Sequence, residues 1–285
     1  MMLKIKIVQT IVACLTFLLG LLINLLLKLQ QKQNQKPHRP PSQKLQMMLM
    51  MIRSELDSDD DRYEVDDERY GLSWRLAVET NNNVRPWKTV PLRCYKHVEN
   101  YMIGGQYELD MNIIVDQIVF YAKSQIPLPS NKDAWIFDVD DTCISNIPYY
   151  KANRFGCEPF DSTMFKAWIN KGMCPANAVV LRLFKTLIQK GFKVFLVTGR
   201  YEETLAKITM DNLHNQGFIG YQRLILRRAE YKGVSAVKYK SSIRKEIENE
   251  GYRIWGNVGD QWTDLQGDSL GNRTFKLPNP MYCIS

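Results

Sequence analysis

Short apolar runs alternate with amphipathic stretches over the second half of the chain. The apolar runs that predict strands are Ala134–Val139, Val194–Thr198, Arg223–Leu226, Arg253–Val258 and Thr274–Leu277. Helical spacing of apolar residues predicts helices over Gln106–Lys123, Asp161–Lys171, Ala176–Lys190, Glu202–Gln216 and Ser241–Gly251. This alternation is typical of an α/β fold, in which helices cover a parallel sheet.

The first residues follow another pattern. Residues 7–27 form a stretch of 21 residues without a charge, which is about the length that crosses the hydrocarbon core of a bilayer. A secretory signal normally has a shorter apolar core, of about 7–15 residues. We therefore favour an uncleaved, single-pass membrane anchor within residues 1–28, with a cleaved signal as the alternative.

The net charge of +8 comes entirely from residues 1–53, which hold eight Lys and Arg and no acid. Basic residues that flank a membrane span need only lipid or solvent as partners, so we expect no nucleic-acid partner. The composition of residues 29–69 predicts a disordered linker that is basic at first and then acidic. Residues 70–285 are predicted to form the folded domain.

Two features bear on the compartment, and they disagree. More Lys and Arg follow the predicted span than precede it, which would keep the C-terminal domain in the cytosol. The sequon Asn272-Arg273-Thr274 points instead to a glycoprotein of the secretory pathway. Six cysteines are present without a CxxC motif, so a zinc site is not expected, and free thiols and disulfides both remain open.

Polar residues stand at the ends of three predicted strands. The first strand ends in Asp138-Val139-Asp140-Asp141-Thr142, the second in Thr198-Gly199-Arg200, and the fourth in Gly259-Asp260-Gln261-Trp262-Thr263-Asp264. Lys240 is expected to open the helix before the fourth strand. Ligands of such sheets bind beyond the carboxyl ends of the strands, so these residues are expected to meet in one site.

These residue types are those that phosphoryl transfer requires. Asp138 can attack phosphorus as a nucleophile. Asp140 can protonate the leaving oxygen and later activate water. The hydroxyl of Thr198, the backbone amides at Gly199 and the ammonium of Lys240 can bind phosphate oxygens.

The negative charge of such a site calls for a hard cation such as Mg²⁺, with Asp138 and Asp260 as ligands. Asp260 and Asp264 are four residues apart, so we place both on one face of the first turn of a helix. The positive end of that helix would favour both carboxylates.

The motifs, in this order, resemble the haloacid dehalogenase-like (HAD) superfamily, and most closely the plant acid phosphatases and vegetative storage proteins of subfamily IIIB. The stretches that carry the resemblance include FDVDDTCISNIPYY (137–150), LVTGR (196–200), YKSSIR (239–244), GNVGDQWTDLQG (256–267) and FKLPNPMY (275–282). The resemblance covers about residues 73–285.

The resemblance implies a Rossmann-like three-layer sandwich with strand order 5-4-1-2-3. It implies that Asp138 is the nucleophile and Asp140 the acid/base. Thr198 and Lys240 fall on phosphate-binding positions. The metal positions are Asp138, the backbone carbonyl of Asp140, Asp260 and, through water, Asp264. Family members are usually secreted or vacuolar, so we expect a membrane-anchored protein of the secretory pathway, vacuole or cell surface, and a cytosolic orientation stays open.

The sequence thus predicts a Mg²⁺-dependent acid phosphatase that hydrolyses phosphate monoesters through an aspartyl-phosphate on Asp138. The alternatives are a storage protein with little activity on the same fold and a membrane-tethered module that only binds phosphorylated ligands. The expected partners are a phosphorylated small molecule and a membrane, and a homodimer is left open. A small helical insert within 143–192 should leave the site fairly open. Arg200 is expected either to clamp the substrate or to pair with a carboxylate. Arg227 and Arg228, which follow the third strand, could attract an anionic substrate, but we favour a solvated turn for both.

Overall fold

The computed structural model describes residues 66–81, 87–124 and 129–284, all within one compact unit. Among these residues, no helix is both long and apolar enough to cross a membrane. The predicted span at 7–27 lies outside the described residues, as does the predicted linker apart from its last residues, since 66–81 are helical. The membrane anchor and the domain boundaries stay predictions.

Five parallel strands form the central sheet, in the order β3-β2-β1-β4-β5. They are β1 (Asp133–Phe137), β2 (Lys193–Tyr201), β3 (Arg223–Arg227), β4 (Arg253–Gly259) and β5 (Arg273–Lys276). The five predicted strands and their order are confirmed. The direction of strand addition reverses next to β1, and such a reversal opens a crevice at the carboxyl ends of the strands.

The five predicted helices are present, with shifted ends. They are α4 (Gln106–Ser124), α6 (Ser162–Ile169), α7 (Ala178–Gln189), α8 (Glu202–Asn215) and α9 (Ala236–Asn249). The prediction that Lys240 opens a helix is wrong. The Ser235 hydroxyl accepts a hydrogen bond from the Lys238 amide (3.3 Å) and caps α9 five residues earlier than expected. Lys240 therefore projects from the second turn of α9.

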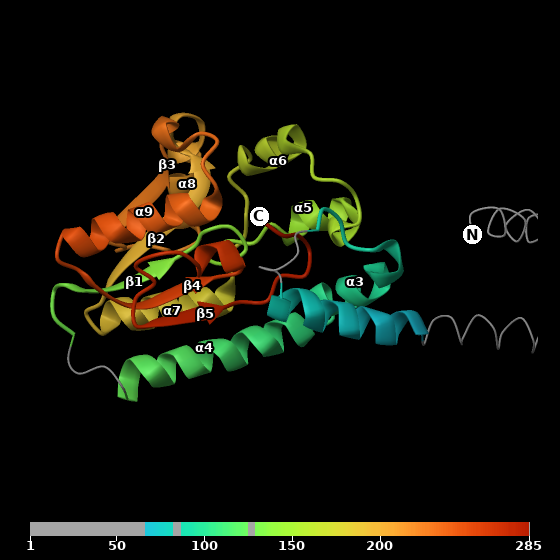
Figure 1. Ribbon diagram of the computed structural model, residues 1–285, viewed down its shortest axis with the longest axis horizontal. Coiled ribbons are helices and arrows are strands. Elements are labelled where there is room, and N and C mark those ends of the chain that lie inside the picture. The colour runs from blue at the N-terminus through green and yellow to red at the C-terminus, as the bar shows by residue number, and fades with distance from the viewer. Residues whose placement is uncertain (1–65, 82–86, 125–128, 285) are drawn as a thin grey trace, which may run out of the picture. The chain divides into compact units, whose positions relative to one another are not determined.

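Alternating residues of the central strands face two helical layers. Trp135 and Phe137 of β1 belong to the core that also contains buried residues of α4 and α7. Ala134 and Ile136 belong to a second core, with Ile243 and other buried residues of α9. Figure 1 shows α4 and α7 on one side of the sheet and α9 on the other. Strand side chains alternate between the two faces, and helices cover both of them, so the predicted three-layer sandwich is confirmed.

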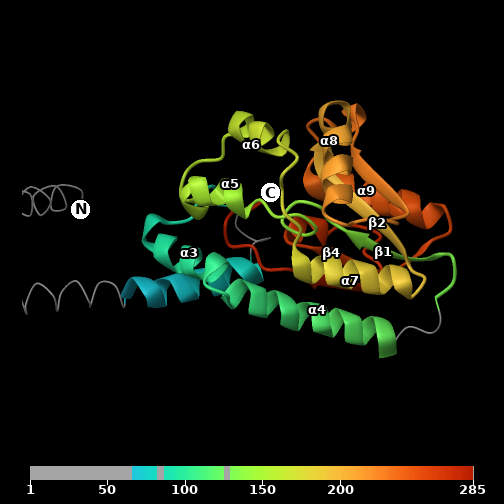
Figure 2. The same ribbon diagram turned by 180° about the vertical axis from the view of Figure 1, so that it is seen from behind.

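A small helical insert lies between β1 and α7, as predicted. It contains α5 (Ile147–Ala152), the 3₁₀ turn η2 (Arg154–Gly156) and α6. Figures 1 and 2 both show α5 close to α3 (Tyr95–Ile103), a helix that the apolar pattern did not predict. Aromatic rings tie the insert to the C-terminal segment: Tyr150 stacks on Tyr282 with 5.0 Å between ring centroids.

The helical residues 66–81 hold the C-terminal segment in place. The Glu79 carboxylate accepts hydrogen bonds from the Asn279 amide (2.7 Å) and the Lys276 ammonium (2.8 Å). The Glu79 carbonyl accepts one from the Trp262 indole (2.9 Å). These contacts join the beginning and the end of the described unit beside the carboxyl end of β4.

Candidate active site

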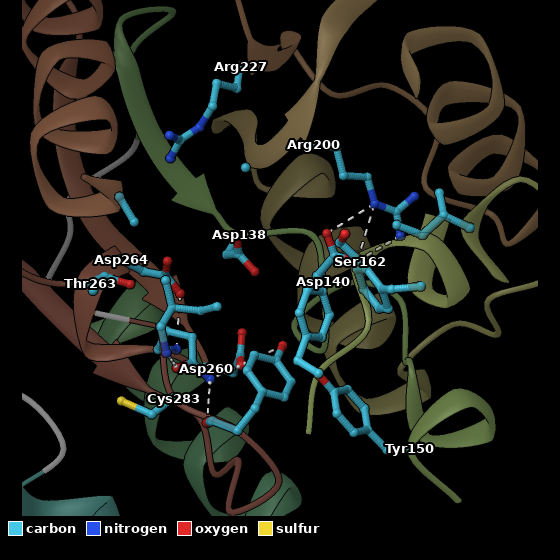
Figure 3. Close-up of a pocket in the computed structure, with 18 of the residues that line it drawn as sticks. Asp138, Asp140, Tyr150, Ser162, Arg200, Arg227, Asp260, Thr263, Asp264 and Cys283 are labelled. Carbon is cyan, nitrogen blue, oxygen red and sulfur yellow. Dashed lines mark hydrogen bonds and ion pairs between the residues drawn. The ribbon is translucent and has the colours of Figure 1, made fainter. Parts of the chain in front are cut away.

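A cavity of about 840 Å³ opens at the carboxyl ends of the strands (Figure 3). Six of the seven predicted site residues line it: Asp138, Asp140, Gly199, Lys240, Asp260 and Asp264. The helical insert and the C-terminal segment contribute aromatic residues, among them Tyr150, Phe165 and Tyr282. The fold thus brings together residues that are more than 120 positions apart in the sequence.

The innermost part of the cavity is an acidic cluster of Asp138, Asp260 and Asp264. One carboxylate oxygen of each lies within 4.8 Å of the others, and all three side chains are buried. Burial raises the pKa of Asp138 well above its usual range, and the neighbouring carboxylates raise it further although Lys240 opposes them. Buried carboxylates this close together fit a hard divalent cation, because carboxylate oxygens are its preferred ligands.

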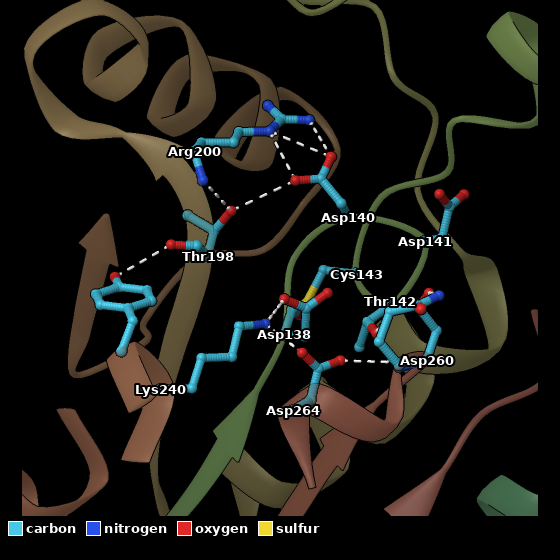
Figure 4. A network of polar contacts seen from close by, with 12 residues as sticks. Asp138, Asp140, Asp141, Thr142, Cys143, Thr198, Arg200, Lys240, Asp260 and Asp264 are labelled. Atoms are coloured by element: carbon cyan, nitrogen blue, oxygen red, sulfur yellow. Dashed lines mark hydrogen bonds and ion pairs between the residues drawn. The ribbon is translucent and has the colours of Figure 1, made fainter. Parts of the chain in front are cut away.

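Lys240 bridges two members of this cluster (Figure 4). Its ammonium donates to Oδ1 of Asp138 and to Oδ1 of Asp264, at 2.5 Å from the latter. Burial lowers the pKa of Lys240, but the two carboxylates outweigh burial and raise it, so the ammonium stays charged. The position of Lys240 in α9 thus places a permanent cation against Asp138.

Asp260 is held by residues from three segments. Thr142 donates its hydroxyl to Oδ1 of Asp260 (3.1 Å), and the Asp260 amide donates back to the same hydroxyl oxygen (3.1 Å). Oδ2 accepts from the side-chain amides of Asn279 (2.7 Å) and Gln261 (2.8 Å). The rotamer of Asp260 is therefore fixed before any ligand binds.

The surroundings of Asp264 correct one sequence-based expectation. The chain after Asp260 forms no α-helix but the three-residue 3₁₀ turn η4 (Trp262–Asp264), so the two carboxylates do not share a helix face. A capping box brings Asp264 back instead, since its carboxylate accepts from the Gln261 amide (3.0 Å). Gly259 permits this approach: a Cβ there would lie 2.4 Å from Oδ2 of Asp264.

Asp140 lies on the other side of Asp138 and pairs with Arg200. The guanidinium donates from Nη2 (2.7 Å) and from Nε (3.0 Å) to the two carboxylate oxygens of Asp140. Burial raises the pKa of Asp140, but Arg200 and a hydrogen bond from Asn146 outweigh it and hold the pKa below its usual range. Of the two roles considered for Arg200, pairing with a carboxylate is the one observed.

Thr198 is the predicted residue that does not line the cavity. It is fully buried, and its hydroxyl accepts from the Arg200 amide (3.1 Å) and donates to Asp140 (3.4 Å). Gly199 does line the cavity, and a Cβ at Gly199 would meet no atom within 4 Å. Space beside the Gly199 backbone is therefore open to a ligand.

Two supporting residues escaped the sequence reasoning. Asn146 is buried and donates its side-chain amide to Asp140 (2.9 Å) and Asp141 (3.2 Å). Arg244 is buried and donates to the backbone carbonyls of Asp264 (2.9 Å) and of two residues after it, which fixes the loop that carries Asp264. Asn146 lies in the motif 137–150 and Arg244 in the motif 239–244. Their place in these motifs was the only sequence feature that pointed to them, because a residue that supports another by hydrogen bonds follows no characteristic spacing.

Arg227 and Arg228 do not share one solvated turn, the location that we favoured from the sequence. Arg228 pairs with Glu230 (3.0 Å) and Glu246 (3.3 Å) at the surface. Arg227 lines the cavity. Cys94, Cys143, Cys157 and Cys174 are free thiols.

The sequence of the chain matches a known family of proteins. Residues 61–285 match the family described as HAD superfamily, subfamily IIIB (acid phosphatase). The chain is 46% identical to acid phosphatase 1 of Solanum lycopersicum over 76% of its own length and 85% of the relative. It is 37% identical to vegetative storage protein 2 of Arabidopsis thaliana over 74% of its length and 79% of the relative.

Solved structures share the fold. The class C acid phosphatase of Bacillus anthracis superposes with a TM-score of 0.51 at 19% sequence identity, over 65% of this chain and 83% of the other. At that identity the likeness concerns the fold alone. The match over residues 61–285 and the identity to the plant relatives confirm the predicted class of protein: the chain belongs to the HAD superfamily, subfamily IIIB, the acid phosphatase family.

Proposed function

We propose that the chain hydrolyses phosphate monoesters with Mg²⁺ through an aspartyl-phosphate on Asp138. The observation that carries this proposal is the environment of Asp138. It is a buried carboxylate at the inner end of the cavity, next to a charged Lys240 and two further carboxylates, with Asp140 two residues along the chain.

The roles of the other residues follow from their places. The Asp138 carboxylate attacks phosphorus, while the Lys240 ammonium and the backbone at Gly199 bind phosphoryl oxygens. Asp138, the Asp140 carbonyl, Asp260 and Asp264 would hold Mg²⁺, which when bound offsets the charge of the carboxylates and the phosphoryl group. Thr198 contributes by its contacts to Asp140 and Arg200.

Asp140 supplies and removes the protons. In its acid form it protonates the leaving oxygen, and as a carboxylate it then takes a proton from the water that attacks the aspartyl-phosphate. Arg200 holds the carboxylate form in place, so the second step starts from an oriented base. An acidic optimum follows, because the first step needs the proton on Asp140.

A storage role is the second candidate, since the chain is similar to vegetative storage protein 2. The complete set of acidic and basic residues around Asp138 favours the enzyme. The cavity volume favours a phosphorylated small molecule as substrate. A single-pass anchor at residues 7–27 in a secretory compartment stays part of the proposal.

The test uses the full chain in detergent with phenyl phosphate, from pH 4.5 to 8, with Mg²⁺ or with EDTA. Turnover should require the metal and fall at least about 10³-fold in Asp138→Asn, equal to about 4 kcal/mol of transition-state stabilisation. Asp116→Asn, at an exposed position on α4, is the matched control. Acid-quenched native enzyme should carry a phosphoryl group on Asp138.

Three outcomes separate the candidates. Metal-dependent turnover that survives in Asp138→Asn would show that Asp138 is not the nucleophile. Folded, metal-loaded protein without turnover of any phosphate monoester would support the storage role. Binding of phenyl phosphate without release of phenol over long incubation would support a binding module.

A further inference from the structure

Three buried or half-buried cationic side chains line the cavity: Lys240, Arg200 and Arg227. Only two of the three pair with a carboxylate. Lys240 pairs with Asp138 and Asp264, and Arg200 pairs with Asp140. Among the described residues, no carboxylate oxygen lies within 4.0 Å of the guanidinium of Arg227. The Arg227 side chain is half-buried in the wall of the cavity. A partly buried cation without a counter-ion has lost part of its hydration, and no opposite charge compensates for that loss. Its charge is therefore available to a ligand.

Arg227 is held rigidly although it has no carboxylate partner. Its Nη1 donates to the backbone carbonyls of Val234 (2.7 Å) and Tyr231 (3.4 Å). The guanidinium carbon lies over the ring of Tyr239, at 4.7 Å from its centroid. Nε is buried and has no hydrogen-bond partner. The planar group is thus oriented in advance, which lowers the entropic cost of binding a ligand.

The same contacts place Arg227 beside the reaction site. Arg227 is the register partner of Tyr201, two residues after Gly199 on β2. The Tyr239 hydroxyl donates to the Thr198 carbonyl (3.1 Å), and the next residue, Lys240, contacts Asp138. Figure 3 shows Arg227 among the side chains around the cavity that holds Asp138. One wall therefore carries the phosphate-binding positions and an oriented guanidinium.

We propose that Arg227 forms a second oxyanion subsite, which binds a carboxylate or second phosphate on the part of the substrate that is not transferred. The inference rests on the proposed phosphatase function and narrows its substrate class to phosphate monoesters with a second anionic group. Lys240, the Gly199 backbone and the cation site already serve the reacting phosphoryl group. A guanidinium presents donors in a planar fork that matches carboxylate and phosphate oxygens.

The test compares aryl phosphates that carry a carboxylate on spacers of increasing length, each paired with its neutral carboxamide. At the best spacer length, native kcat/KM should be about 10- to 100-fold higher for the carboxylate, because the neutral carboxamide makes a weaker hydrogen bond to the guanidinium and leaves its charge unpaired. The ratio should fall to about 1 in Arg227→Met and persist in the control Arg228→Met. Arg227→Lys, which keeps the charge and loses the fork, should give an intermediate ratio.

Two results would overturn the subsite. One is a native ratio near 1 at every spacer length. The other is an equal loss for carboxylate and carboxamide in Arg227→Met, which would assign Arg227 to the reacting phosphoryl group. Failure of the phosphatase proposal is separate, because it would abolish turnover of the carboxamides by native protein.

Calorimetry with the unreactive phosphonate analogues of each pair supplies a readout without turnover. Native protein and Arg228→Met should bind the carboxylate phosphonate more tightly than the carboxamide, by the same factor as the kcat/KM ratio. Arg227→Met should bind the two equally. Melting curves identify a variant that fails to fold, and Arg227→Lys then decides the outcome.

Discussion

Arg200 and Asp140 form a two-pronged ion pair inside the cavity, with the Arg200 side chain 3% exposed and that of Asp140 21% exposed. The pair requires the carboxylate form of Asp140, whereas the first step of the proposed reaction requires its acid form. Arg200 therefore orients Asp140 and at the same time disfavours the proton that Asp140 must deliver.

Replacement of Arg200 should uncouple these two effects. In Arg200→Gln the positive charge is gone, so the pKa of Asp140 rises and its acid form persists to higher pH. The descending limb of the kcat/KM profile should then move to higher pH, while kcat falls by about 10-fold or more because Asp140 is less well oriented.

The measurement is a pH–rate profile of native and variant enzyme with one aryl phosphate. A limb that belongs to ionisation of the substrate will be common to both proteins. If kcat falls and the limb stays where it was, Arg200 acts on the position of Asp140 alone.

The two glycines of the site should respond differently to a methyl group. In Gly259→Ala the new Cβ would lie 2.4 Å from the Asp264 carboxylate, so Asp264 must move and Mg²⁺ affinity should fall about 10- to 100-fold. Gly199→Ala meets no protein atom within 4 Å and should keep metal affinity and stability. If the phosphoryl group of the substrate occupies the space beside the Gly199 backbone, Gly199→Ala should raise KM while metal affinity stays native.

Calorimetric Mg²⁺ titration and the Mg²⁺-induced rise in melting temperature measure the loss of metal affinity in Gly259→Ala. Steady-state kinetics measure the change in KM in Gly199→Ala. Native-like metal affinity in Gly259→Ala would show that Asp264 is not needed to hold the cation.

Asp133 should make stability depend on pH. Its carboxylate accepts hydrogen bonds from the Arg253 guanidinium (2.9 Å), the Trp255 indole (2.7 Å) and the Ser130 amide (2.7 Å). Burial raises the pKa of Asp133, but these donors outweigh burial and lower it. A depressed folded-state pKa gives stability that is present above the unfolded value, about 3.9, and is lost as pH falls through the folded value.

Asp133→Asn should therefore cost about 2 kcal/mol near neutral pH, since hydrogen bonds to a charged acceptor are the stronger kind. The difference from native protein should begin to shrink below about pH 4, where Asp133 of the unfolded chain takes up its proton, and should be lost as the pH falls through the lower folded-state pKa. Denaturant unfolding at several pH values measures this, with Asp211→Asn at the surface as the control. A difference that stays constant with pH would contradict the charge as its cause.

The strands were predictable because short apolar runs that alternate with amphipathic stretches are typical of a parallel sheet covered by helices. The meeting of Asp138, Asp140 and Asp260 followed from the edge at which parallel strands end. The strand order came from the family resemblance. The short helices near the insert were not predictable, since α5 has six residues and shows no period.

Details of the site depended on local hydrogen bonds that a periodicity does not encode. Ser235 moved the start of α9, and the capping box of Gln261 replaced the expected helix at Asp264. The pairing of Arg200 with Asp140 required knowledge of which side chain faces which across the strand ends. The sequence did not show that Arg227 lines the cavity while Arg228 pairs with acidic residues at the surface. Adjacent residues at the end of a strand differ only in the face of the sheet on which their side chains lie.

The link between Glu79 and Asn279 bears on how the protein comes into being on the ribosome. The two residues are 200 positions apart, and Asn279 in turn orients Asp260. Asp138 and its neighbours leave the exit tunnel while Asn279 and Tyr282 are still to be translated. A contact so distant in sequence closes a long loop, and strands β1 to β4 can pair before Asn279 is available to complete the cation site. During synthesis, the side chain that orients Asp260 would therefore be absent until residue 279 has been added.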